Sequence, residues 1–186
     1  MITGGRVRLR AIESKDLPRF VDWLNDPEVI AGLDRSTPLG IDEEEEWFRE
    51  IQKRDPIERP LAIDALRDTT WRHIGGCNLF DFNHQVRRAS SGIMIGDKSC
   101  WGQGYGTEAI QLLLEHAFMT LNLNRVDLQV YDDNQRAIDM YRKVGFVEEG
   151  RLRDYHFREG KYFDTLIMSI LRDEWLEGRR GRPKNG

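Results

Sequence analysis

The sequence contains little cysteine and no recognisable metal-binding pattern. Only Cys77 and Cys100 occur among 186 residues, so a disulfide framework is not expected. The four histidines are scattered, and none has the H-E-x-x-H spacing of a zinc enzyme. We therefore predict no metal site and two ordinary reduced thiols, as is typical of a cytoplasmic protein.

Long apolar runs and a strong excess of one charge are also missing. No apolar stretch approaches the roughly 18 residues of a membrane-spanning helix, and the N-terminal MITGGRVRLR lacks the apolar region of a secretory signal. The 28 Lys and Arg residues against 32 Asp and Glu residues give a formal net charge of −4. This balance argues against a dedicated nucleic-acid binder. We therefore expect a cytoplasmic protein whose partners include neither membranes nor nucleic acids.

The hydrophobic pattern predicts one α+β domain. Strands are expected at 7–11, 61–66, 74–82, 89–96, 125–131, 146–151 and 162–171, and helices around 14–24, 42–51, 109–118 and 134–144. Strands joined by hairpins pair antiparallel, whereas the strand–helix–strand passage from 93 to 131 predicts a parallel, right-handed crossover. We expect a mixed, mostly antiparallel sheet of about seven strands flanked by about four helices over residues 1–172. A basic, flexible C-terminal extension is expected at 173–186.

A glycine-rich loop between a strand and a helix is the clearest candidate site. It comprises Trp101, Gly102, Gln103, Gly104, Tyr105, Gly106 and Thr107. Glycines allow backbone N–H groups to approach a ligand, and the positive N-terminus of the helix favours a pyrophosphate. The loop is not a Walker motif, because no lysine stands between Gly106 and Thr107, and its G-x-G-x-G spacing does not match a dinucleotide fingerprint. A coenzyme A pyrophosphate loop and a turn with no ligand remain as interpretations.

A second pattern follows the loop at the expected separation. The signature N-x-x-A-x-x-x-Y-x-x-x-G-F is complete in Asn134, Ala137, Tyr141, Gly145 and Phe146. Together with the two small residues of [RQ]-x-x-G-x-[GA] in the glycine loop, it resembles the GNAT superfamily of acetyl-coenzyme A-dependent N-acetyltransferases. The segments EGRLRD at 149–154 and GKYFD at 160–164 are similar to the branch with ribosomal-protein alanine and spermidine acetyltransferases.

The resemblance implies a single-domain GNAT (acyl-CoA N-acyltransferase) fold and an acetyl-CoA-dependent N-acetyltransferase. Acetyl-CoA would be the co-substrate, and the acceptor would be a primary amine of a small molecule or of a peptide or protein N-terminus. The implied coenzyme-binding residues are Met94, Ile95, Asn134 and the whole loop from Trp101 to Thr107. We expect a monomer or homo-oligomer, with a dimer favoured. A catalytically silent acyl-CoA sensor and an interaction protein with an empty loop are the alternatives.

The reaction requires a neutral amine, a stabilised oxyanion and a protonated leaving thiolate. An alkyl amine has a pKa of about 10.4, so desolvation or a base must remove its proton. In the family, Tyr141 corresponds to the acid that protonates the thiolate, and a backbone N–H of Met94 or Ile95 corresponds to the oxyanion donor. The alternatives are that Tyr141 is a core residue with a satisfied hydroxyl and that Asn134 is only a helix N-cap. We expect direct transfer without an acetylated cysteine.

The sequence leaves the base and the acceptor side open. Ser90 and Ser91 stand where many relatives carry an acidic residue, so this chain must deprotonate the amine differently. The acidic run Asp42–Glu46 could attract a cationic amine, but we favour the simpler interpretation of a helix start with Asp42 as its cap. Asp34, Arg35 and Glu28 are candidates for the acceptor side.

Overall fold

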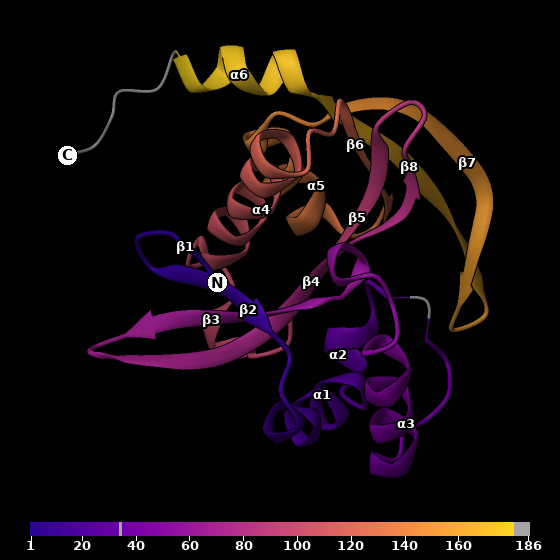
Figure 1. Ribbon diagram of the computed structural model, residues 1–186. Helices are drawn as coiled ribbons and strands as arrows, with labels where there is room; N and C mark the ends of the chain where they lie inside the picture. Colours follow the sequence, from indigo (N-terminus) through magenta and orange to yellow (C-terminus); the bar gives the residue numbers. More distant parts are fainter. Residues whose placement is uncertain (34, 181–186) are drawn as a thin grey trace. The chain divides into compact units, whose positions relative to one another are not determined.

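The computed structural model describes residues 1–33 and 35–180, with Arg180 described by its backbone alone. The described chain forms two compact units (Figure 1). The first unit consists of Met1–Phe80 and Gly92–Leu113, and the second of Asp81–Ser91 and the residues from Leu114 onward. Two strands and one helix contain residues of both units.

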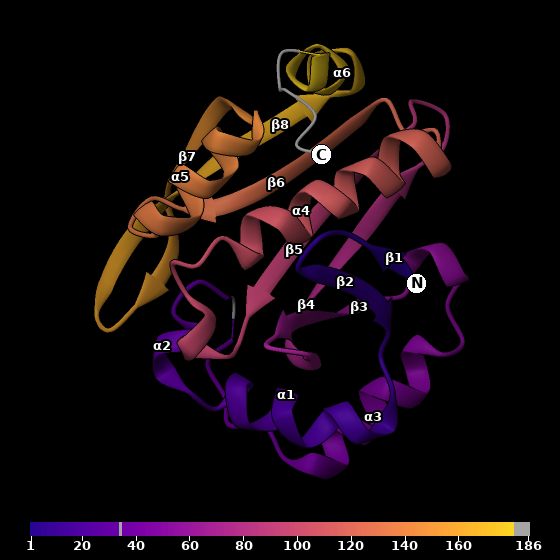
Figure 2. The ribbon, with the colours of Figure 1, turned by 90° about the vertical axis from the view of Figure 1, so that its left-hand side faces the viewer.

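The first unit carries the N-terminal half of the sheet. Its strands are β1 (Ile2–Thr3), β2 (Val7–Ala11), β3 (Leu61–Arg67) and most of β4 (Thr70–Asn83), together with the last residues of β5 (Arg88–Ile95). The neighbouring strands from β1 to β4 pair antiparallel. Its helices are α1 (Leu17–Leu24), α2 (Pro27–Ile30), α3 (Ile41–Ile51) and most of α4 (Tyr105–Glu115). Helices α1 and α3 lie side by side (Figure 2).

The second unit carries the C-terminal half of the sheet. Its strands are the start of β5, β6 (Arg125–Tyr131), β8 (Lys161–Leu171) and β7 (Val147–Arg158). Strand β6 pairs parallel with β5 and antiparallel with β8, which in turn pairs antiparallel with β7. The helices are α5 (Gln135–Val144) and α6 (Arg172–Arg180). The strand order across the sheet is β1-β2-β3-β4-β5-β6-β8-β7.

The predicted α+β class, mixed sheet and parallel β5–β6 pair are confirmed. Within the described residues the sheet has eight strands rather than about seven, because the two-residue β1 pairs with β2, and six helices replace the expected four. The additional helix α2 begins at Pro27, just beyond the helix predicted around 14–24. Proline is tolerated at a first helical position, and the Asp26 side chain accepts a hydrogen bond from the Glu28 amide.

The helix α6 occupies much of the segment that we expected to be a flexible extension. It follows β8 directly, and Trp175 is buried with its ring 5.4 Å from that of Phe118. This aromatic contact packs the segment against the rest of the second unit. The basic composition of the segment did not predict it. Residues 181–186 lie outside the described part of the chain.

The start of α3 differs from the expectation. The N-cap is Gly40, so Asp42 lies in the first turn and the prediction that Asp42 caps the helix is wrong. Of the acidic run, Glu44 is buried and its neighbours in the run are exposed. A helix starting at Ile41 rotates Glu44 onto the inner face, one turn before Phe48 and Ile51.

Candidate active site

The glycine loop presents a continuous row of unpaired amides. Gly102 and Gly104 adopt positive φ values of 72° and 85°, which favour glycine. Helix α4 begins at Tyr105, directly after these turns. Among the described residues, the backbone N–H groups of 102–107 have no hydrogen-bond acceptor. The loop therefore offers several donors and the positive end of an 11-residue helix to an anion.

Two side chains of the loop hold it in place by donating to backbone carbonyls that precede it. The indole Nε1 of Trp101 donates to the carbonyl oxygen of Ile95 at 2.6 Å. The Gln103 amide donates to the Ser99 carbonyl four residues earlier. Trp101 therefore anchors the loop to the strand, which explains why the position accepts an aromatic residue in place of glutamine or arginine.

Arg6 brings a cation to the same loop. Its Nη2 donates to the carbonyl of Gln103 at 3.3 Å, and its guanidinium lies 5.0 Å from the centre of the Tyr105 ring. Glu108 accepts from the Arg6 amide at 2.7 Å and lies 3.5 Å from its Nε, which orients the arginine. The side chain of Arg6 is about half exposed, so its charge stays accessible beside the loop.

The end of β5 is packed against small residues. A Cβ at Gly75 would lie 2.0 Å from the carbonyl oxygen of Met94, and a Cβ at Gly96 would lie 2.1 Å from the Trp23 ring. The amide of Gly96 donates to the carbonyl of Ile74 at 2.9 Å. Gly75 therefore allows β4 to approach the backbone of Met94 and Ile95, and Gly96 allows the Trp23 ring to approach the backbone just after them.

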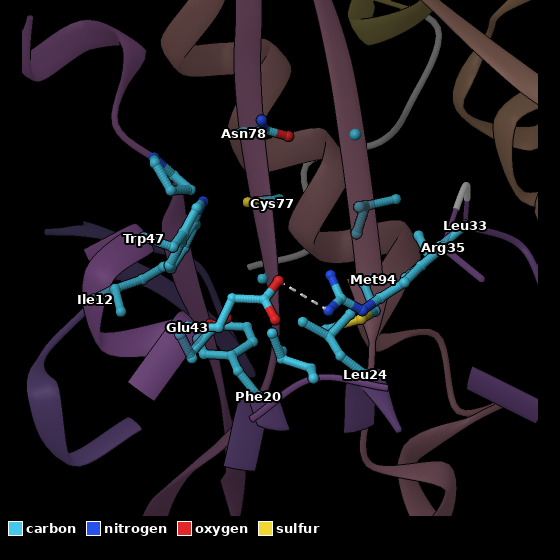
Figure 3. A pocket seen from close by; sticks show the side chains of 16 residues that line it. Ile12, Phe20, Leu24, Leu33, Arg35, Glu43, Trp47, Cys77, Asn78 and Met94 are labelled. Atoms are coloured by element: carbon cyan, nitrogen blue, oxygen red, sulfur yellow. Dashed lines mark hydrogen bonds and ion pairs between the residues drawn. The ribbon is translucent and has the colours of Figure 1, made fainter. Parts of the chain in front are cut away.

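A cavity of about 350 Å³ lies beside this strand end (Figure 3). It is lined by Ile12, Phe20, Leu24, Leu33, Arg35, Leu39, Glu43, Glu44, Trp47, Pro60, Gly76, Cys77, Asn78, Gly92, Ile93 and Met94, all in the first unit. Most of the wall is apolar, with the Phe20 and Trp47 rings 6.5 Å apart. Its size and its few charged groups are typical of a site for a small ligand.

The charged groups of the cavity are incompletely paired. Arg35 and Glu43 point toward one another and form an ion pair of 3.3 Å (Figure 3). The Nε atom of Arg35 is buried without a hydrogen-bond partner. Glu44 is 4% exposed, and its carboxylate has no hydrogen bond or ion pair within the described residues. Burial raises the pKa of Glu44 above its ordinary value, against the lowering effect of the Arg35 charge.

The two cysteines are buried residues of the first unit. Cys77 lines the cavity, but burial raises its pKa to about 12, so the thiolate is scarce at neutral pH. Cys100 is buried, and its Sγ accepts a hydrogen bond from Arg67 at 3.3 Å. Both cysteines are free thiols. No group of residues able to hold a metal ion occurs in the described chain.

Asn134 and Tyr141 lie on α5 in the second unit. The side chain of Asn134 caps the helix by accepting from the Ala137 amide at 3.2 Å. Tyr141 is 6% exposed and packs edge-on against Phe146 at 5.4 Å. Its hydroxyl has no hydrogen-bond partner among the described residues, in contrast to the expectation for an ordinary core tyrosine. Burial raises the pKa of Tyr141, which keeps the hydroxyl protonated through the neutral range.

The two serines that replace an acidic residue are tied to β6. Ser90 Oγ donates to Asp127 Oδ1 at 2.7 Å, and Ser91 Oγ donates to the Asp127 backbone carbonyl at 3.4 Å. Asp127 itself forms ion pairs with Arg88 and Arg125. The oxygens of Asp127 are therefore engaged by two guanidinium groups and a hydroxyl, and we do not assign Asp127 the role of the missing acid.

The structure separates the predicted residues into groups. Met94, Ile95 and the loop 101–107 belong to the first unit, and Asn134 and Tyr141 belong to the second. Arg35 lines the cavity, whereas Glu28 forms an ion pair with Lys98, and Asp34 lies outside the described residues. Glu44 was not predicted as a cavity residue, because we interpreted the acidic run as a helix start. The spacing of Glu44 to Phe48 and Ile51 was the available signal.

Comparison with known proteins identifies the family. Residues 6–147 match the profile of the acetyltransferase (GNAT) domain. The spermidine N(1)-acetyltransferase of Vibrio cholerae is 33% identical over 92% of this chain and 96% of its own length. The putative ribosomal N-acetyltransferase YdaF of Bacillus subtilis is 28% identical over 94% and 95%. A crystal structure of the Vibrio enzyme with CoA and spermine superimposes with a TM-score of 0.84 at 29% identity, covering 93% of this chain and 99% of that one.

The match to the domain and the similarity over nearly the whole chain define an acetyltransferase fold. The chain belongs to the GNAT family. It is an acetyl-CoA-dependent N-acetyltransferase that acts on amines, and not a silent sensor. No helix in the described part of the chain is both long and apolar enough to cross a membrane.

Proposed function

We propose that the protein transfers the acetyl group of acetyl-CoA directly to a primary amine, with the coenzyme pyrophosphate bound by the loop 101–107. The observation that carries this proposal is the row of unpaired amides at the start of α4. Such donors bind a pyrophosphate without a metal ion, because the backbone N–H groups and the helix dipole act together. Arg6 adds the cation that the loop itself lacks.

Tyr141 donates a proton to the departing thiolate of coenzyme A. The support is its place in the complete second signature, its unpaired hydroxyl and its raised pKa. A backbone N–H of Met94 or Ile95 stabilises the oxyanion, and the rigid packing of Gly75 against this backbone supports that role. Asn134 caps α5 and thereby positions the helix that carries Tyr141.

The acceptor amine occupies the cavity beside β5. Apolar walls with carboxylates at Glu43 and Glu44 suit an amine on a short carbon chain, whether a small molecule or a protein N-terminus. Relatives named for spermidine support an amine of this general class. A cytoplasmic location and a homodimer remain our predictions, and light scattering tests the second.

Acetylation of a panel of amines, followed by release of free thiol from acetyl-CoA, tests the function. The panel contains spermidine, alaninamide and isopropylamine, and each product is identified by its mass gain of one acetyl group. We expect turnover with at least one of them above the rate of acetyl-CoA hydrolysis. If coenzyme A binds in calorimetry but no amine of the panel is acetylated, the result would favour a catalytically silent sensor. If coenzyme A does not bind, the assignment of the loop is wrong.

A further inference from the structure

Two unpartnered groups of opposite charge face the cavity in the first unit. Glu44 is 96% buried as a residue and its carboxylate has no hydrogen bond or ion pair within the described residues, and the Nε atom of Arg35 is buried without an acceptor. The two side chains are close enough for the Arg35 charge to act on Glu44. Buried polar groups without partners are rare in folded proteins, and where they line a cavity a ligand that pairs with them is one explanation.

The surroundings of Glu44 do not provide the missing partner. Arg35 forms its ion pair with the neighbouring Glu43, at 3.3 Å, and the rest of the wall near these residues is apolar. Burial makes the ionised form of Glu44 costly, which the raised pKa reflects. Glu44 is thus the buried member of a run of exposed acidic residues. A cation that enters the cavity would explain its position.

We propose that Glu44 and Arg35 together hold the acceptor, the Glu44 carboxylate binding its amine and the Arg35 Nε–H donating to an oxygen of the same molecule. This inference rests on the proposed function and adds the recognition chemistry. The acceptor class is an amine with a neutral oxygen acceptor beside it, such as an amide carbonyl or a hydroxyl. A plain alkyl amine or a polyamine leaves the Arg35 Nε–H unpaired, and a site that leaves a buried donor unpaired discriminates strongly against such a ligand.

Glu44 also takes the proton that the acceptor must lose. The ammonium group transfers one proton to the carboxylate, and the neutral nitrogen then attacks the acetyl carbon. The new C–N bond forms, the C–S bond breaks, and the second amine proton leaves as the thiolate becomes the thiol. The base thus comes from α3, on the helix side of the cavity, instead of from the β5 positions held by Ser90 and Ser91.

A matched pair of acceptors tests the Arg35 contact. Alaninamide carries an amide oxygen beside its amine, and isopropylamine replaces that amide by a methyl group. In Arg35→Met the ratio of kcat/KM for alaninamide to that for isopropylamine should fall roughly ten- to hundredfold relative to the parent, the effect of one hydrogen bond from a charged donor. Arg35→Met also breaks the ion pair with Glu43, but an effect of that loss on both acceptors cancels in the ratio. Arg35→Lys keeps the charge without the Nε–H and should lower the ratio as well, whereas Arg49→Met on the outer face of α3 should not.

Glu44→Gln tests the amine contact on both acceptors. We expect kcat/KM to fall about a hundredfold or more for each, with Glu46→Gln, an exposed member of the same run, as the control. The melting temperature of Glu44→Gln should equal or exceed that of the parent, because a buried charge is removed. A drop in activity without a drop in stability is not the signature of a merely structural residue.

The pH dependence separates proton acceptance from packing. The loss in Glu44→Gln should be smaller at pH 9 than at pH 7, because the neutral fraction of isopropylamine rises about a hundredfold over that range. The other titratable and charged groups of the cavity are Arg35, Glu43 and Cys77, and the Cys77 pKa of about 12 keeps that thiol neutral.

Each outcome has a defined meaning. Parent-like kcat/KM in Glu44→Gln overturns the inference, and an unchanged acceptor ratio in both Arg35 variants overturns the assigned acceptor class. If the parent acetylates no amine at all, the proposed function itself fails, which the thiol assay reports before any variant is compared.

Discussion

Tyr141 is a buried residue, and its hydroxyl is unpaired within the described chain and difficult to ionise. Tyr141→Phe removes this one hydroxyl and keeps the ring against Phe146, so the fold should persist. General acid catalysis contributes about 10² to 10⁴-fold, and we expect kcat to fall near the low end of that range, because a thiolate is already a fair leaving group. The coenzyme Kd, measured by calorimetry, should change little.

The raised pKa gives this prediction a pH signature. A general acid acts in its protonated form, so activity that depends on Tyr141 is lost as pH rises through its pKa. Since burial raises that pKa above the ordinary value of about 10, the parent rate should show no tyrosine-dependent decline below pH 10. A Phe variant that retains at least half of the parent kcat, with chemistry rate-limiting, would rule out the acid role.

Gly104 tests the pyrophosphate loop. Its φ of 85° disfavours any L side chain, so Gly104→Val strains the backbone as well as blocking the approach of a phosphate. Gly160 has a similar φ of 78° in the turn between β7 and β8, with no atom within 4 Å of an added Cβ, which makes Gly160→Val a control for strain alone. We expect both variants to melt earlier, but only Gly104→Val to raise the KM for acetyl-CoA, by about tenfold or more. Equal KM values would locate the pyrophosphate elsewhere.

Gly75 tests the packing beneath Met94. An added Cβ would lie 2.0 Å from the Met94 carbonyl oxygen and 3.0 Å from the Ile95 Cα, so the strand itself must move. Gly75→Ala should destabilise the fold by about 1–3 kcal/mol in denaturant unfolding. It should also lower kcat, because the backbone that holds the oxyanion shifts. Gly178→Ala on the exposed side of α6, where an added Cβ meets nothing, should leave kcat unchanged and slightly stabilise the helix.

At the scale of elements, the bulge in β7 creates a specific ion pair. The register of β7 on β8 shifts between Glu148 and Gly150, and the extra residue Glu149 turns its carboxylate to Arg125 at 2.5 and 2.8 Å and to Ser169 Oγ at 2.7 Å. The hydrogen bond from the Arg125 guanidinium is the main cause that lowers the pKa of Glu149 to about 2, and the Ser169 hydroxyl is the second. The bulge therefore links three strands of the second unit through one side chain.

The lowered pKa predicts the pH range in which this pair stabilises the fold. The folded protein holds the proton of Glu149 less tightly than the unfolded chain, so the stabilisation is complete above pH 4.5 and disappears as pH falls toward 2. Because the two side chains are 27% and 41% exposed, solvent screening limits the effect to about 1 kcal/mol. Melting curves of Glu149→Gln and the parent should differ at pH 7 and converge near pH 2, while Glu148→Gln should differ little at either pH. A difference that persists at pH 2 would contradict the ion-pair explanation.

The elements also show what the sequence could predict. The long helix behind the glycine loop, the helix that ends at Gly145 and the parallel β5–β6 pair follow from local spacing, and the structure has each of them. The burial of Glu44 was not predicted, because Asp42 was taken as the cap of a helix that in fact starts at Ile41; only the spacing of Glu44 to Phe48 and Ile51 indicated its inner position. The Arg6 contact with the loop joins residues about a hundred positions apart, which no local pattern contains.

For the molecule as a whole, the kinetic scheme follows from the surroundings of its two cysteines. Cys77 has a pKa of about 12, and Cys100 is only 2% exposed, so neither thiol is suited to carry an acetyl group between two half-reactions. Amine and thioester must then be bound at the same time, and the acetyl group passes once, from sulfur to nitrogen. Initial rates with both substrates varied should give intersecting lines in double-reciprocal plots. Mass spectrometry of the protein after incubation with acetyl-CoA alone should show no added acetyl group, and a Cys77→Ala variant should retain its turnover. Parallel lines together with a stable acetylated cysteine would replace direct transfer by a covalent intermediate.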